Sequence, residues 1–330
     1  MGPIMQHAQC NTRGKRQVWR ALELRMVHNR LRSATRMVGA LALPLALPAC
    51  TTPADEPLEA GPSALSGNLA VVGGPTLILY KAAPSRSLYL HVFQPDRNAF
   101  PGERPAMLFF HGGGWVEGDA GRFFDQAKHL ADLGMVAISA DYRIASVDGS
   151  NPRTALADAN SAMRFVRTNA DALGIDPDRI AAAGGSAGGQ LAAALATAEG
   201  FDDPDDDLGV STRPAALVLF NPVIDNGPDG YGHRNVLDYW ERFSPLHNIR
   251  PGHPPTVILL GTADRLIPVE TGQLYCDKVR AVGSECGLHL YEGQPHAFFS
   301  RQRSKIYYQK TLDAMDEFLR SIGYLGPTEE

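Results

Sequence analysis

The chain has 330 residues, of which 44% are hydrophobic and 20% are charged, and its formal net charge at pH 7 is −5. These values are those of an ordinary globular protein with enough apolar residues for a sizeable core. The charge is uneven, because residues 1–50 carry +7 and leave −12 for the rest of the chain. A negative folded part argues against nucleic acid as a partner.

The N-terminal segment is typical of an export signal. Three arginines within residues 30–36 precede an apolar run, residues 37–49, which is too short to span a bilayer. The run ends at Cys50 and resembles a bacterial lipoprotein signal, in which that cysteine is lipidated and becomes the new N-terminus, although Pro48 departs from the usual pattern. We therefore expect residues 1–50 to be a leader that directs the protein to the periplasm or cell envelope.

Met26 is a better start for this signal than Met1, because it opens a compact positive region directly before the apolar run; residues 1–25 would then be untranslated. A single membrane-anchoring helix is the alternative. Residues 51–75 are rich in Pro, Ala, Gly, Ser and Glu, which predicts a flexible tether. We expect one folded domain over residues 76–326, with a membrane partner only through the lipid anchor.

After the tether, short β-type runs alternate with helical patterns. Strands are predicted at Thr76–Lys81, Leu88–Phe93, Ala106–Phe110, Met135–Ala140, Ile180–Ala183, Ala215–Phe220, Thr256–Leu260 and Leu288–Tyr291. Helices are predicted at Arg122–Gly134, Ala155–Gly174, Gly188–Glu199, Val269–Gly283 and Lys305–Ser321. This alternation is typical of an α/β protein with a wound sheet between helices. The longest stretch outside it follows a strand, and we expect a small cap near residues 222–255.

A glycine-rich turn between a predicted strand and helix, Gly184–Gly189, holds a serine near its centre. The Gly-x-Ser-x-Gly pattern lets strand and helix pack closely around a strained turn, which exposes the Ser186 hydroxyl above the sheet. A phosphate loop would need Gly-x-Gly-x-x-Gly with a downstream acid, or Gly-Lys-Ser/Thr, and neither occurs here. Ser186 is therefore the candidate nucleophile.

A second glycine loop, residues 111–115, follows the predicted strand at 106–110. Its three consecutive glycines can turn several backbone N–H groups toward one point. Acyl transfer needs such donors, because the tetrahedral intermediate carries a negative oxygen. We expect an oxyanion hole formed by the N–H groups of Gly113, Gly114 and Ala187.

Two further strand ends carry the groups that a serine nucleophile needs. Asp264 stands just past the apolar strand at 256–260, whereas the competing acids Glu270 and Asp277 lie on the next helix. A solvated helix face or the helix dipole explains those two more simply. His296 lies in a loop after the last strand and can serve as general base, with Asp264 orienting its ring.

The chain order Ser, Asp, His is that of α/β-hydrolases. The region from about Thr76 to Tyr324 resembles this fold, with a mostly parallel central sheet, helices on both faces and a small cap. The two glycine motifs resemble the hormone-sensitive-lipase-like esterase branch, and bacterial acetyl and feruloyl (acetylxylan-type) esterases within it. Gly185 supports this closer match, because many members of the branch carry Asp there. The run Tyr291–His296 also fits.

The resemblance implies a serine carboxylic-ester hydrolase that acts through a covalent acyl-enzyme on short acyl groups, with no cofactor. Small-molecule or carbohydrate esters are the expected partners, and long triglycerides are expected to be poor substrates. An amidase, formamidase or peptidase with the same triad is the alternative enzyme. An inactive hydrolase-fold binding protein is the alternative of another class, and it would require a broken triad.

Candidate substrate contacts are the aromatic residues Trp115, Tyr231, Trp240 and Phe298, and packing within the cap is the alternative for Tyr231 and Trp240. Cys276 and Cys286 lie ten residues apart and are candidates for a disulfide in an exported protein, a pairing that the sequence leaves open. No Cys or His stands at ligand spacing, so we expect no metal. Arg143 is expected to pair with an acid. The acyl group, the alcohol and the oligomeric state are not predicted.

Overall fold

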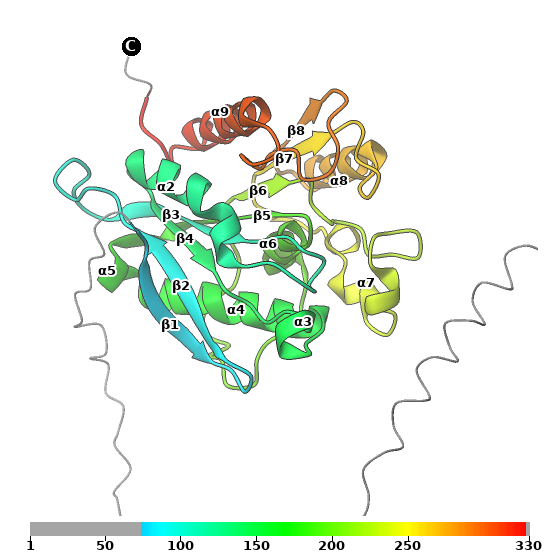
Figure 1. The fold of residues 1–330 in the computed structure, drawn as a ribbon, viewed down its shortest axis with the longest axis horizontal. Helices are drawn as coiled ribbons and strands as arrows, with labels where there is room; N and C mark the ends of the chain where they lie inside the picture. Colours follow the sequence, from blue (N-terminus) through cyan, green and yellow to red (C-terminus); the bar gives the residue numbers. More distant parts are fainter. Residues whose placement is uncertain (1–73, 328–330) are drawn as a thin grey trace, which may run out of the picture. The chain divides into compact units, whose positions relative to one another are not determined.

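The computed structural model describes residues 74–327, which contain an eight-stranded sheet (Figure 1). Its strands are β1 (Thr76–Ala82), β2 (Ser87–Phe93), β3 (Arg104–Phe110), β4 (Val136–Ala140), β5 (Ile175–Gly185), β6 (Leu217–Phe220), β7 (Thr256–Gly261) and β8 (Cys286–Tyr291). The expected leader with Cys50, and the expected tether up to residue 73, lie outside the described residues.

The strand order is β1-β2-β4-β3-β5-β6-β7-β8. β2 pairs antiparallel with both β1 and β4, and every pairing from β4 through β8 is parallel. Parallel strands have their C-terminal ends at one edge of a sheet, where open α/β proteins bind their ligands. The turns after β3, β5, β6, β7 and β8 are therefore neighbours in space.

The connections and the C-terminus form helices. They are α2 (Phe124–Asp132), α3 (Ala145–Asp148), α4 (Pro152–Thr168), α5 (Ala170–Leu173), α6 (Ala187–Thr197), α7 (Trp240–Phe243), α8 (Val269–Ala281) and α9 (Lys305–Ser321), with 3-10 turns η1 (Ala120–Phe123), η2 (His233–Asn235) and η3 (Pro245–His247). Within residues 74–327 we find no helix with the length and apolar character needed to cross a membrane.

Helices cover both faces of the sheet. Successive strand residues point to opposite sides, so neighbouring residues of one strand pack against different helices. On β3, Leu108 and Phe110 belong to the core cluster that includes residues of α4, α5, α6 and α8. Met107 and Phe109 belong to the other cluster, with residues of α2 and α9. The predicted α/β architecture, with a mostly parallel sheet between two helical layers, is confirmed.

Helix boundaries differ from the prediction where capping decides them. The helix expected at 155–174 begins earlier, at Pro152, because the Asn151 side chain accepts a hydrogen bond from the Thr154 N–H at 3.0 Å and proline suits the first helical position. It is interrupted at Asn169, which separates α4 from α5.

Strand β5 is longer than predicted. Its first half, Asp176–Arg179, lacks the apolar pattern of a buried strand, yet Ile175 pairs with Arg104 on β3. The segment predicted as a cap contains only η2, α7 and η3. Helices of three or four residues carry no detectable hydrophobic period, so the sequence pattern did not predict them.

Two side-chain pairings that the sequence raised, one open and one predicted, are present in the described structure. Cys276 on α8 and Cys286 at the start of β8 form a disulfide, the pairing that the sequence left open. Arg143 pairs with the buried carboxylate of Asp158 at 2.6 Å, which confirms its structural role. Lys81 on β1 reaches the same carboxylate at 2.8 Å, so this acid also connects the edge of the sheet to α4.

Candidate active site

Ser186 lies in a tight turn between β5 and α6, with φ 55° and ψ −120°. This left-handed φ is rare for residues with a side chain and is typical of the nucleophile turn of hydrolases. The neighbouring glycines are required by close backbone contacts. A Cβ on Gly188 would lie 2.0 Å from the carbonyl oxygen of Phe110, and one on Gly184 would lie 2.3 Å from that of Gly188.

The structure brings Ser186, His296 and Asp264 together in one hydrogen-bonded chain. His296 Nε2 lies 2.9 Å from Ser186 Oγ, and His296 Nδ1 lies 2.7 Å from Asp264 Oδ2. The Asp264 side chain is completely buried, and its Oδ1 accepts hydrogen bonds from the backbone N–H groups of Leu266 and Ile267 at 2.8 and 3.1 Å.

This arrangement fixes the tautomer of the imidazole. A carboxylate only accepts, so His296 Nδ1 carries the hydrogen that it donates to Asp264, and the lone pair of Nε2 faces the Ser186 hydroxyl. The ring can therefore take a proton from Ser186, while Asp264 stabilises the resulting imidazolium. This is the geometry that general-base activation of a serine requires.

The predicted oxyanion loop lies directly against the serine turn. A Cβ on Gly112 would be 2.8 Å from the Gly185 carbonyl oxygen and 3.2 Å from Ser186 Cβ. Gly113 and Gly114 have φ of 131° and 64°, values that favour glycine. Ala187 begins α6 immediately after the serine. All three predicted donors thus belong to the two segments that meet at Ser186, and their role as an oxyanion hole stays a prediction.

A pair of buried aromatic side chains supports this loop. The ring of Tyr142 stacks on His111 at 4.2 Å, and its hydroxyl donates to the His111 carbonyl oxygen at 2.7 Å. His111 Nδ1 lies 2.9 Å from the Gly112 carbonyl oxygen, which can only accept, so this nitrogen carries the hydrogen. Burial lowers the pKa of His111 to about 4 and keeps the ring neutral near pH 7. Sequence reasoning missed Tyr142 because its partner lies 31 residues away.

Sequence reasoning also missed Asn221, which is the first residue after β6. Its side chain lies 3.4 Å from His296 Nε2 and accepts a hydrogen bond from the Ala297 N–H. The available signal was its place directly after a buried strand. Asp264 and His296 were predicted from the same kind of place in the sequence.

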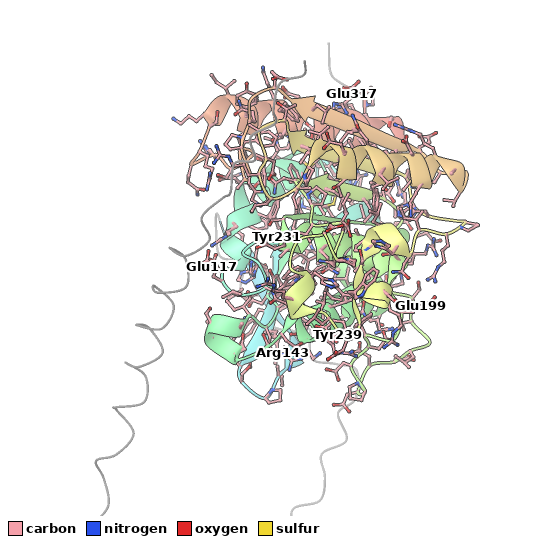
Figure 2. The ribbon with its side chains drawn as sticks, turned by 90° about the vertical axis from the view of Figure 1, so that its right-hand side faces the viewer. Glu117, Arg143, Glu199, Tyr231, Tyr239 and Glu317 are labelled. Atoms are coloured by element: carbon pink, nitrogen blue, oxygen red, sulfur yellow. A yellow bond between two sulfur atoms is a disulfide. The ribbon has the colours of Figure 1, made fainter. Side chains whose placement is uncertain are left out.

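The four aromatic candidates for substrate contacts occupy different environments. Tyr231 of the cap, which is labelled in Figure 2, places its hydroxyl 3.2 Å from the position of a Cβ on Gly114, so it faces the oxyanion loop. Trp115 is buried, with its indole N–H 3.3 Å from Gln190 Oε1 of α6. Trp240 packs between the rings of His233 and His247 inside the cap.

Phe298 packs into the core instead of facing the serine turn. Only 2% of this residue is exposed, and its ring packs against Tyr291 of β8 and Tyr307 of α9. The next residue, Phe299, is the one near the serine turn, because its ring would lie 2.7 Å from a Cβ on Gly185. Both residues belong to the turn that follows His296, where the sequence carries no periodic pattern to tell which side chain faces the serine.

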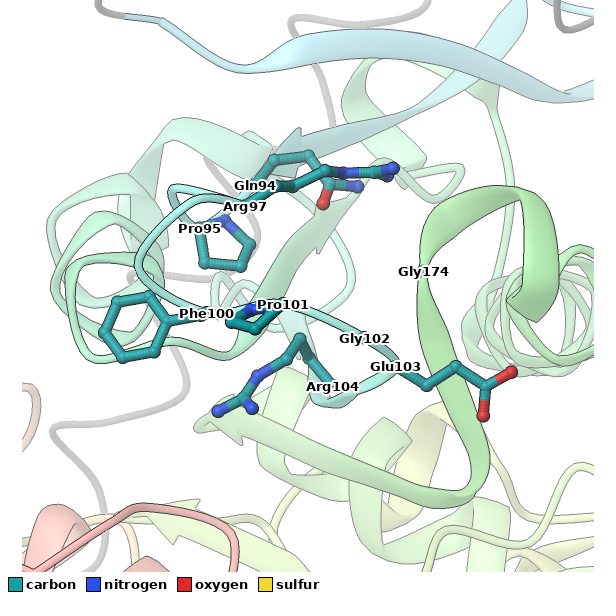
Figure 3. A pocket seen from close by; sticks show the side chains of 9 residues that line it. All are labelled: Gln94, Pro95, Arg97, Phe100, Pro101, Gly102, Glu103, Arg104 and Gly174. Carbon is teal, nitrogen blue, oxygen red and sulfur yellow. The ribbon is translucent and has the colours of Figure 1, made fainter.

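Residues 74–327 hold no cluster of three or more His, Cys, Asp or Glu side chains that could ligate a metal ion. A surface hollow of about 310 Å³ lies near Arg104, at the start of β3 (Figure 3). Gln94, Glu103 and Gly174 contribute to its lining. Because Arg104 begins β3 and the serine turn lies beyond the opposite end of the parallel strands, this hollow is separate from the candidate site.

Comparison with known proteins places these features in a family. The BD-FAE family model matches residues 90–228, and the dienelactone hydrolase family model matches residues 233–324. Esterase LipC of Mycobacterium tuberculosis is 30% identical over 59% of this chain and 53% of its own length. An acetylxylan esterase of Xylanibacter ruminicola is 27% identical over 60% of this chain and 42% of its own length. The chain thus spans about half the length of these curated relatives.

A solved structure matches more completely. Thermogutta terrifontis esterase 2, in a propionate-bound form, is 38% identical, with a TM-score of 0.74 over 78% of this chain and 98% of that chain. The sheet order and the position of the glycine turn define an α/β-hydrolase. With these relatives, the chain belongs to the α/β-hydrolase carboxylesterases.

Proposed function

We propose that the protein is a serine esterase that hydrolyses short-chain carboxylic esters. The observation that carries this proposal is the continuous chain from Ser186 Oγ through the His296 ring to the buried carboxylate of Asp264, with distances of 2.9 and 2.7 Å. A triad of this geometry supports nucleophilic attack by serine, since base and orienting acid are both within hydrogen-bond reach.

The proposed reaction has two halves. Ser186 Oγ attacks the ester carbonyl while its proton moves to His296 Nε2, and the N–H groups of Gly113, Gly114 and Ala187 stabilise the oxyanion. The C–O bond to the alcohol then breaks, and the alcohol leaves with the proton from Nε2. Water attacks the acyl-serine by the same route, which releases the carboxylic acid and restores the serine.

A short acyl chain is supported by the packing beside α6. The buried Trp115 bonds to Gln190, and Gln190 Nε2 donates to the Phe243 carbonyl oxygen at 3.2 Å. Gln190 is one helical turn from Ser186, so these side chains fill space close to the nucleophile. Solved forms of Thermogutta terrifontis esterase 2 hold propionate and butyrate, which are short acids.

A carbohydrate ester is the proposed substrate class. Its support is the relative named acetylxylan esterase and the expected export of the chain, which would give access to polysaccharide esters.

Export and a lipid on Cys50 remain part of the proposal. Fractionation of cells that express the wild type or Cys50→Ser tests them: loss of membrane association in the variant supports lipidation, and an unchanged distribution contradicts it.

Substitution of the nucleophile tests the reaction. We expect Ser186→Ala to lose hydrolysis of p-nitrophenyl acetate by a factor on the order of 10⁶, because the covalent step is removed. Ser146→Ala is the matched control, since Ser146 is an exposed serine of α3 and should keep wild-type turnover. The wild type should cleave the acetyl ester much faster than the palmitoyl ester. Retained activity in Ser186→Ala would contradict the proposal.

A covalent probe identifies the nucleophile independently. Thermogutta terrifontis esterase 2 has been solved phosphorylated by paraoxon, so the same reagent suits the protein described here. We expect mass spectrometry to find a diethylphosphoryl group on the peptide that contains Ser186, and none in Ser186→Ala.

A panel of acetylated and feruloylated sugars then measures the alcohol preference. Faster turnover of an anilide or N-formyl substrate than of any ester would favour the amidase alternative.

A further inference from the structure

Asn221 lies beside the candidate base, in a conformation that costs free energy. It is fully buried and has φ of +34°, a region that residues with side chains seldom adopt, although Asn tolerates it better than most. Its N–H donates to the Leu259 carbonyl oxygen of β7 at 2.8 Å. The preceding residue, Phe220, accepts the Ser186 N–H at 3.0 Å. The backbone therefore fixes residue 221 relative to the serine turn.

The Asn221 side chain makes two contacts with the histidine loop. Oδ1 accepts a hydrogen bond from the Ala297 N–H at 3.1 Å, and Nδ2 lies 3.4 Å from His296 Nε2. The Ala297 N–H can only donate, so the amide atom that faces it must be oxygen, which leaves the NH₂ group toward the ring. Ala297 also has a positive φ, 61°, and its N–H is held by this hydrogen bond.

We propose that Asn221 is a positioning residue that holds His296 Nε2 on the Ser186 hydroxyl. Among the side chains that contact the ring, Asp264 of the turn after β7 is charged, whereas Ser186 after β5 and Asn221 after β6 are neutral. At 3.4 Å the amide N–H shares the Nε2 lone pair of the neutral ring with the Ser186 hydroxyl, and it opposes the N–H of a protonated ring. Asn221 thus fixes the ring and favours return of its proton to the leaving alcohol. This inference rests on the proposed esterase reaction.

Removal of the side chain tests the positioning role. Asn221→Gly loses both contacts but relieves the positive φ, so the variant should fold. We expect kcat for p-nitrophenyl acetate to fall about 10- to 100-fold while KM stays within about threefold, because a misplaced base slows chemistry more than binding. A kcat within about twofold of the wild-type value would overturn the proposal.

Replacement of the amide by a carboxylate tests the contact with Nε2. Asn221→Asp keeps an acceptor for the Ala297 N–H but puts a negative charge beside the ring, which stabilises the imidazolium. We expect the acid limb of kcat/KM to move up by about 1 pH unit or more. Asn169→Asp is the matched control: that amide donates to the Phe165 carbonyl oxygen on α4, so its acid limb should stay in place. An unmoved acid limb in folded Asn221→Asp would overturn the proposal.

A measurement without turnover separates this inference from the esterase reaction. In Ser186→Ala protein, the titration of the His296 ring can be followed by NMR with and without Asn221→Asp. A midpoint that rises with the second substitution supports the contact, whatever the substrate proves to be. Coincident titration curves contradict it, even if ester hydrolysis by the wild type is established.

Discussion

The serine turn combines an unusual backbone at one residue with very close packing at its neighbours. Ser186 adopts its positive φ because α6 starts directly beside the end of β3, and Gly188 lies against the carbonyl oxygens of Phe110 and His111. The approach of helix and strand brings the turn to the oxyanion loop. The strained φ of Ser186 is compatible with the fold only while Gly188 stays against the carbonyl oxygens of Phe110 and His111.

Gly188→Ala tests this close approach. The new Cβ would lie 2.0 Å from the Phe110 oxygen and 2.4 Å from that of His111, and backbone atoms cannot move aside cheaply. We expect a loss of about 3 kcal/mol or more in the free energy of unfolding, and at least a 100-fold loss of kcat. Gly326→Ala is the control, because a Cβ there meets nothing within 4 Å. Urea unfolding and ester turnover are measured; wild-type values for Gly188→Ala would contradict the close packing.

At the residue scale, the sequence predicts those groups whose type and position both carry information. Ser186, Asp264 and His296 each follow a recognisable strand. A serine, an acid and a histidine at such strand ends are explained by few functions other than catalysis. Asn221 has the same kind of position, but an asparagine after a strand is equally typical of an ordinary turn. Its function depends on Ala297, 76 residues away, and no local pattern reports that contact.

At the scale of elements, the strands carry the site because their C-terminal ends share one edge. The buried strands could be predicted from their apolar runs, and the order of nucleophile, acid and base follows from the order of β5, β7 and β8. The cap could not be predicted in detail, because α7 has four residues and is positioned by tertiary contacts. The ring of Phe243, for example, packs against Trp115 and Phe201.

The disulfide between α8 and β8 should stabilise the protein without affecting catalysis. It closes a loop over a sequence separation of 10, for which the chain-entropy model gives about 2–3 kcal/mol. Cys286 begins β8, whereas His296 follows its other end, so turnover should persist at 25 °C. We expect Cys276→Ala/Cys286→Ala to lose this amount in urea unfolding. Reductant should lower the melting temperature of the wild type but not of the double variant; equal responses would contradict the prediction.

At the scale of the whole molecule, a partly buried carboxylate in the loop after α6 pairs with the edge strand of the sheet. Asp203 accepts from Lys81 of β1 at 2.6 Å. Burial alone would raise the pKa of Asp203, but the hydrogen bonds from Lys81 and from the Asp205 N–H outweigh it and hold the pKa below its usual value. A carboxylate with a depressed pKa stabilises the fold above about pH 4 and loses that contribution as the pH falls further.

Two buried histidines change the stability of the fold at a higher pH than Asp203 does. Burial lowers the pKa of both His111 and His253 to about 4, whereas an unfolded histidine titrates near 6.5. Between these values the unfolded chain binds protons that the native protein does not, so stability must fall as the pH falls from about 6.5 to about 4. From pH 8 to pH 5 this amounts to about 2 kcal/mol for each histidine.

His253→Gln isolates one of these contributions away from the candidate site. His253 Nε2 lies 3.0 Å from the Tyr275 hydroxyl of α8, and its Nδ1 lies 2.9 Å from the Pro254 carbonyl oxygen, so the variant will be less stable at pH 8. Glutamine does not titrate, however, and the decrease in the free energy of unfolding from pH 8 to pH 5 should shrink by about 2 kcal/mol. Urea unfolding at pH 8, 6.5 and 5 measures this slope. Parallel curves for wild type and variant would mean that His253 binds its proton equally well in the folded protein.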